Sequence, residues 1–90
     1  MDHMKVIFRK YDDDVIAFFP EIKVNFGNVM SYMHIGQHCE ASYDFYTSTK
    51  KATETEFLPL LQELEMVYDD VVLDVKQRIK YNDLMQKAWC

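Results

Sequence analysis

The stretch Lys5–Phe19, KVIFRKYDDDVIAFF, decides the fold of this chain. Two runs rich in β-branched and aromatic residues, Lys5–Lys10 and Val15–Phe19, flank a short acidic segment. Aspartate tolerates turn conformations and hydrogen-bonds its own backbone. The stretch therefore predicts a β-hairpin with Asp12 and Asp13 in its loop.

A loop at these two aspartates sets the register of the hairpin. The predicted pairs are Phe8 with Ala17 and Val6 with Phe19 on one face, and Ile7 with Phe18 and Arg9 with Ile16 on the other. Both faces then carry apolar side chains, so we expect strands that are covered on both sides or that expose an aromatic patch for contact. Pro20 ends the second strand because it has no backbone N–H to donate.

The region after the hairpin is less regular. Glu21–Phe26 alternates between apolar and polar residues, and a Gly-Asn pair separates it from a predicted third strand, Val29–Ile35. The pattern allows either a two-residue turn or an irregular excursion before that strand. Gly36 breaks the run, and Gln37–Thr49 shows neither helical nor strand periodicity.

A helix is predicted to follow. Thr53 and Glu56 have the spacing of a capping box, and apolar residues then recur at helical spacing: Phe57, Leu60, Leu61, Leu64 and Val67 or Tyr68. Pro59 is expected either to kink the first turns or to move the start of the helix to near Leu58. A last strand, Val71–Ile79, comes after it.

The order β-β-β-α-β predicts an α+β fold with two layers, a mostly antiparallel sheet packed on one main helix. Ninety residues suit one domain, which we assign to residues 4–80. Residues 1–3 are interpreted as a cloning remnant before a natural start at Met4, and residues 81–90 as a short helix or a frayed tail.

Composition limits the class of protein. Apolar residues are 49% and charged residues 28% of the chain, values typical of a soluble globular protein. No apolar run approaches the roughly 18 residues of a membrane span, and no leader is recognisable. Cys39 and Cys90 are interpreted as reduced thiols, which together with these absences predicts a cytoplasmic protein.

Charge argues against a nucleic-acid partner. The net charge is −5, and acidic residues without any base run from Glu54 to Asp74, so the predicted helix would repel phosphate. Four basic residues near the C-terminus form a weak alternative surface: Lys76, Arg78, Lys80 and Lys87.

The segment Val29–Thr49 contains the most unusual mixture of side chains, with both internal histidines, one cysteine and four aromatics. Aromatic side chains anchor protein interfaces, whereas stacking on nucleic acid also needs interleaved bases, which are absent here. We therefore expect contact with a protein partner or a second copy. The candidate binding residues are Tyr32, His34, His38, Tyr43, Phe45 and Tyr46.

His34, His38, Cys39 and Glu40 are possible metal ligands, and Cys39 beside a histidine suggests a thiolate nucleophile. Gly36 lies between the two histidines and disrupts the helical spacing that a zinc pair needs, and no second ligand cluster is present. The sequence thus predicts no metal, no cofactor and no catalytic residue. A metal-binding or hydrolytic protein centred on His34, His38 and Cys39 stays as an alternative.

Two resemblances add to this reading. Through MKVIFRK, AFFPEI, MSYMHIGQHCEASYDFY and TKKATETEF, the chain from Met4 to Ile79 resembles short bacterial proteins of uncharacterised function, also found in phages and mobile elements. This resemblance implies a small α+β fold and no activity.

The second resemblance covers Lys5–Ile22, which is similar to the opening of HicB-type antitoxins. In that family a β-β-β-α-β fold inhibits a small toxin, and the resemblance implies a binding role. The chain departs from the family by its long Gly27–Thr49 insertion and by the lack of a recognisable DNA-binding module. Our leading hypothesis is a non-enzymatic protein–protein interaction module, with a HicB-like antitoxin as an alternative.

Overall fold

The hairpin forms as predicted. In the computed structural model, which describes residues 2–22, 24–25, 27–33, 37–77 and 79, β1 (Asp2–Tyr11) pairs antiparallel with β2 (Asp14–Phe19). The pairs Ile7–Phe18, Phe8–Ala17 and Arg9–Ile16 all have the expected register. Asp12 has a positive φ of 53°, which aspartate adopts more readily than most residues.

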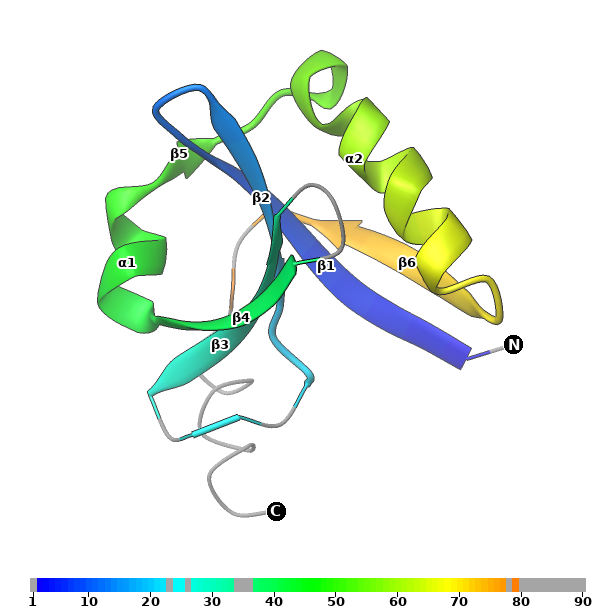
Figure 1. The fold of residues 1–90 in the computed structure, drawn as a ribbon, viewed down its shortest axis with the longest axis horizontal. Helices are drawn as coiled ribbons and strands as arrows, with labels where there is room; N and C mark the ends of the chain where they lie inside the picture. Colours follow the sequence, from blue (N-terminus) through cyan, green and yellow to red (C-terminus); the bar gives the residue numbers. More distant parts are fainter. Residues whose placement is uncertain (1, 23, 26, 34–36, 78, 80–90) are drawn as a thin grey trace.

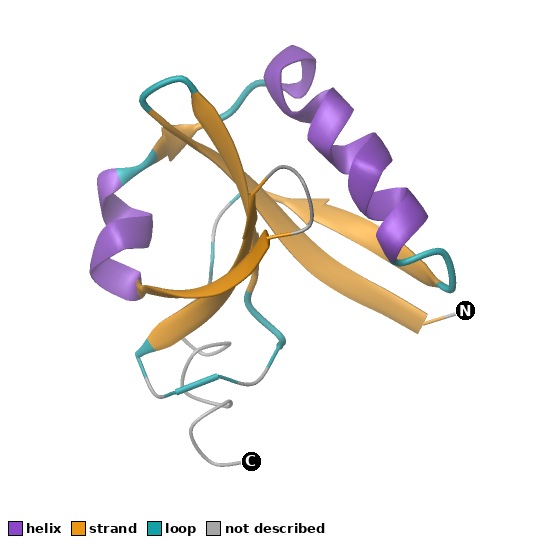
Figure 2. Ribbon diagram, viewed as in Figure 1, coloured by secondary structure: helices purple, strands orange, loops and turns teal. Residues whose placement is uncertain are grey.

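In the described part of the chain, the sheet has six strands, and Figures 1 and 2 show their arrangement. β3 (Asn28–Met33) and β4 (Gln37–Ser42) extend it antiparallel beyond β2. The other edge of β1 is shared by β5 (Lys50–Lys51), which is antiparallel, and β6 (Val71–Lys76), which is parallel. The predicted α+β fold with a mostly antiparallel sheet on one main helix is confirmed.

The main helix, α2 (Glu54–Val67), begins where the capping box predicts. The Thr53 side chain accepts a hydrogen bond from the Glu56 N–H, and the Glu56 carboxylate accepts one from the Thr53 N–H at 3.0 Å. Pro59 lies inside the helix, so the alternative start near Leu58 is wrong. Pro59 has no N–H to donate to the backbone carbonyl four residues earlier. Because Pro59 is exposed, water can bond that carbonyl instead.

Each face of the hairpin is covered by a helix. Of the two arrangements expected for a hairpin with two apolar faces, the structure has strands covered on both sides. On one face α2 packs Leu60 and Leu64 against the sheet, and the rings of Phe8 and Phe57 stack 4.4 Å apart. On the other face, α1 (Tyr43–Ser48) packs Tyr46 against Phe18, with ring centroids 5.3 Å apart. Figure 2 shows the two helices on opposite sides of the sheet.

Several boundaries differ from the sequence expectations. The described part of Glu21–Phe26 forms turns and irregular backbone. An irregular segment, and not a strand followed by a two-residue turn, therefore precedes β3. β4, α1 and β5 were not predicted, because their short lengths show no clear period. β6 ends at Lys76, three residues before the predicted end. Residues 34–36 and 80–90 lie outside the described residues.

Candidate functional site

Two of the candidate binding residues, Tyr32 and Tyr46, lie in the core. Tyr32 is 1% exposed, and its hydroxyl donates a hydrogen bond to the carboxylate of Glu63 on α2. Tyr46 is 5% exposed, its hydroxyl accepts a hydrogen bond of 2.9 Å from the Ile79 N–H, and the Arg9 guanidinium lies 5.1 Å from its ring centre. Neither side chain is open to a partner.

Tyr43 and Phe45 are half-buried on α1. The helix forms because the Ser42 side chain caps it, accepting a hydrogen bond from the Phe45 N–H at 3.0 Å. Phe45 then packs 5.2 Å from Tyr11 and 6.4 Å from Phe18, measured between ring centres. Part of the segment that shows no clear periodicity is therefore a short helix, and its aromatic side chains pack against the hairpin face that carries Phe18.

Of the candidate residues that the structure describes, His38, on β4, is the exposed one. Its Nε2 lies 2.8 Å from the hydroxyl of Tyr68. The centres of the His38 and Tyr32 rings lie 4.7 Å apart in a T-shaped arrangement. Burial raises the pKa of Tyr68, so its phenol keeps its proton at neutral pH. This contact positions His38 against the end of α2. His34 lies outside the described residues.

The possible metal ligands are not brought together where they can be located. Cys39 follows His38 on β4, and adjacent strand residues face opposite sides of a sheet. Glu40 instead accepts hydrogen bonds of 3.1 Å from the Asn25 N–H and the Asn28 side chain. Among the described residues, no three His, Cys, Asp or Glu side chains form a group that could hold a metal ion.

A different surface stands out, and it combines an open strand edge with exposed apolar side chains. Within the described part of the chain, β6 pairs with β1 along one edge only. Exposed large apolar residues gather at the end of α2 and along β6: Met66, Val67, Val72 and Val75. Met66 is 82% exposed and Val75 is 40% exposed. We call these four residues and the free edge of β6 the β6 surface.

Acidic residues surround the β6 surface. Glu65, Asp69 and Asp70 are exposed at the end of α2 and in the turn that leads to β6, and Asp74 lies within the strand. Figure 1 shows the end of α2 beside the start of β6. No base occurs between Glu54 and Val75, although the neighbouring strand β1 places Lys5 opposite Asp74, and His3 Nδ1 lies 3.1 Å from the Asp74 carboxylate. Because Val72 and Val75 are three residues apart on β6, they face opposite sides of the sheet and flank its free edge.

The sequence expectations placed the contact surface in the aromatic segment Val29–Thr49, so they missed the β6 surface. The signal was present in the run VVLDV, which is more apolar than a strand with one wet face requires. Of the proposed basic surface, only Lys76 lies in the described part of the chain, where it is exposed at the end of β6. Neither described helix is long and apolar enough to cross a membrane.

The chain matches no known protein family, no curated protein and no solved structure.

Proposed function

We propose that this chain is a non-enzymatic domain that binds a protein partner, and that the partner adds a strand to the free edge of β6. The observation that supports the proposal is the position of the exposed apolar residues. Four of them lie on the β6 surface, next to backbone groups that have no strand partner on that side among the described residues. Exposed apolar side chains beside an unpaired edge are typical of strand-addition sites.

Among the described residues, the free edge of β6 carries neither proline nor a bulge, and its charged residues are Asp74 and Lys76. Proteins commonly block an edge with proline, inward charges, bulges or a covering loop. β6 has six residues without proline, and its ladder to β1 runs unbroken from Asp2–Val71 to Ile7–Lys76. A partner strand would gain backbone hydrogen bonds from alternate residues and would cover Val72 and Val75.

The opposite edge of the sheet supports this choice by contrast. β4 also has one strand partner among the described residues, but its exposed side chains include His38, Cys39 and Glu40. Two of these are already engaged, His38 with Tyr68 and Glu40 with Asn25 and Asn28. The edge of β4 offers a partner less apolar surface than the β6 surface does.

Charge favours a basic partner over a second copy of this chain. Pairing β6 with itself would bring two acidic borders together, including Asp74 of both copies, and like charges across a sheet are destabilising. A strand rich in Lys or Arg would instead neutralise Asp69, Asp70 and Asp74. We therefore infer a heterologous partner with a basic contact surface.

A HicB-like antitoxin is a second candidate within the same class. It is supported by the element order, because β1, β2 and β3 precede α2 and β6, and β4, α1 and β5 are added to the β-β-β-α-β order of that family. An acidic inhibitor that occupies a basic partner is consistent with the charge of the β6 surface.

Co-expression with the products of the neighbouring genes tests the proposal. Each product is expressed with the chain and the mixture is separated by size-exclusion chromatography. We expect a basic product to co-elute and to protect the β6 amides from hydrogen exchange. Val72→Lys should weaken this complex by about tenfold or more, since it places a positive charge where a basic strand would bind.

Leu58→Lys is the matched control, because Leu58 is also an exposed apolar residue but lies near the start of α2. It should leave the complex intact. The proposal is wrong if no product binds, if Val72→Lys binds as well as the natural chain, or if protection occurs away from β6. Elution of the chain alone as a dimer, abolished by Val72→Lys, would replace the basic partner with a second copy.

A further inference from the structure

A second surface, at the other end of α2, collects the positive charge of this acidic chain. The register of β5 against β1 places Lys51 opposite Arg9 and Lys50 opposite Lys10. Four cationic residues therefore occupy two adjacent rungs of the sheet. Like charges directly opposite each other on a sheet are destabilising, so packing and stability alone do not favour this arrangement.

Two of the four cations have partners within the protein. The Lys10 ammonium lies 2.6 Å from a Glu56 carboxylate oxygen, and the Arg9 guanidinium donates to Thr49 and lies over the ring of Tyr46. The Arg9 contacts are to neutral groups, so they leave its charge in place. Among the described residues, neither Lys50 nor Lys51 forms an ion pair, and both side chains are exposed.

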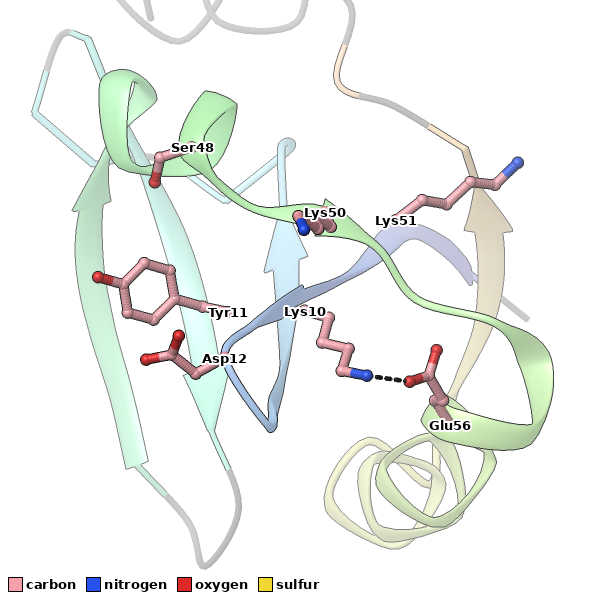
Figure 3. A pocket seen from close by; sticks show the side chains of 7 residues that line it. All are labelled: Lys10, Tyr11, Asp12, Ser48, Lys50, Lys51 and Glu56. Carbon is pink, nitrogen blue, oxygen red and sulfur yellow. Dashed lines mark hydrogen bonds and ion pairs between the residues drawn. The ribbon is translucent and has the colours of Figure 1, made fainter.

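These lysines border a hollow of about 370 Å³ at the end of the sheet. Figure 3 shows it between the end of α1 and the first turn of α2, with Lys10 extending to Glu56 and with Lys50 and Lys51 extending from β5 in different directions. Its lining residues are Lys10, Tyr11, Asp12, Ser48, Lys50, Lys51 and Glu56. The volume is at the lower end of the range for small-molecule sites.

We propose that this hollow binds a small molecule through a phosphate or pyrophosphate group, held by the ammonium groups of Lys10 and Lys50 with Lys51 at the rim. Antiparallel pairing puts the side chains of Lys10 and Lys50 on the same face of the sheet, so both can approach one anion. Lysine binds phosphate as a compact point charge and needs no bidentate geometry. Tyr11 also lines the hollow, and Figure 3 shows its ring pointing away from Lys10.

Glu56 is one of two acidic residues that line the hollow, the other being Asp12. Its hydrogen bond to Lys10 and its hydrogen bonds with Thr53 lower its pKa to about 2, so it is ionised at neutral pH and occupies Lys10. An anion must therefore share Lys10 with this carboxylate. Replacing Glu56 by Gln removes the competing charge, and glutamine also serves at this position of a capping box, so the start of α2 is preserved.

Titration with inorganic pyrophosphate at constant ionic strength, followed by amide NMR, tests the proposal. We expect saturable shifts centred on Lys10, Ser48, Lys50 and Lys51. Lys50→Gln should weaken binding by about fivefold, and Glu56→Gln should strengthen it by about threefold, as expected for removing one charge near the anion.

Two matched variants separate a site from general attraction between charges. Lys76→Gln and Glu65→Gln make the same charge changes on exposed residues outside the hollow, and both should leave the pyrophosphate affinity unchanged. Shifts that stay linear with concentration, or equal effects of Lys50→Gln and Lys76→Gln, would overturn the proposal. So would a ten-nucleotide single-stranded DNA that displaces pyrophosphate and binds about tenfold more tightly, since the hollow would then serve a nucleic-acid backbone.

Discussion

Tyr46→Ala removes the side chain by which α1 covers the second face of the hairpin. The ring is 5% exposed, lies 5.3 Å from Phe18 and beneath the Arg9 guanidinium, and carries the hydroxyl that accepts the Ile79 N–H. If this aromatic is core, its removal destabilises the fold. If it serves an interface, its removal affects binding and leaves stability nearly unchanged.

The expected loss can be worked from these contacts. Truncation of a buried aromatic ring to alanine costs about 3–5 kcal/mol. A domain of this length has a total stability of about 5–13 kcal/mol, so Tyr46→Ala would be strongly destabilised or unfolded at 37 °C. Tyr46→Phe keeps the ring and leaves the Ile79 N–H without its acceptor, at a cost of about 1–2 kcal/mol.

Urea unfolding followed by circular dichroism measures both losses. Tyr11→Phe is the control, because Tyr11 is an exposed tyrosine at the end of β1 and its substitution should change stability by less than about 0.5 kcal/mol. A loss below about 1 kcal/mol for Tyr46→Ala, with an unchanged m-value, would refute the assignment of α1 to the core. Tyr46 would then return to the list of contact residues.

Three further predictions concern α2. Leu64→Ala should lower the free energy of unfolding by about 3–5 kcal/mol in thermal or urea unfolding, because Leu64 is fully buried, whereas Met66→Ala, at an 82% exposed position, should change it by less than about 0.5 kcal/mol. Thr53→Ala removes one half of the capping box and should cost about 1 kcal/mol, with helix content reduced in the same circular-dichroism spectra. The third prediction is a pH dependence: because the pKa of Glu56 is lowered from 4.5 to about 2, its stabilising contribution is complete above pH 4.5 and is lost as the pH falls toward 2. The stability difference between the natural chain and Glu56→Gln should therefore shrink over that interval, and a difference that stays constant from pH 6 to pH 2.5 would contradict the ion pair with Lys10.

The hairpin and the main helix could be predicted because their signals are local. The loop aspartates set which residues face each other, and the side-chain period of two then sets both faces of β1 and β2. Thr53 and Glu56 mark the start of α2 through hydrogen bonds within one turn, which is why Pro59 did not displace it. Neither feature depends on where the rest of the chain lies.

The candidate site could not be predicted in this way, because burial depends on residues far apart in the sequence. Tyr32 and Tyr46 are residues of the type that contact surfaces use, but both are buried. Tyr32 packs in the cluster under α2, and Tyr46 packs against the opposite face of the hairpin. The lysine hollow depends on β5 pairing with β1, which joins residues forty apart. A two-residue strand has no period from which this pairing could be inferred.

The sequence alone determined the α+β class, the hairpin register and the start of α2, since turn chemistry, alternation and capping act over a few residues. The tertiary structure decided which apolar residues are exposed. β6 lies parallel to β1 at the edge of the sheet, and this long-range placement leaves Val72 and Val75 open to solvent, although their pattern is that of a buried strand. Burial is a property of the assembled layers, so only the fold could move the candidate contact surface from the aromatic segment to the β6 surface.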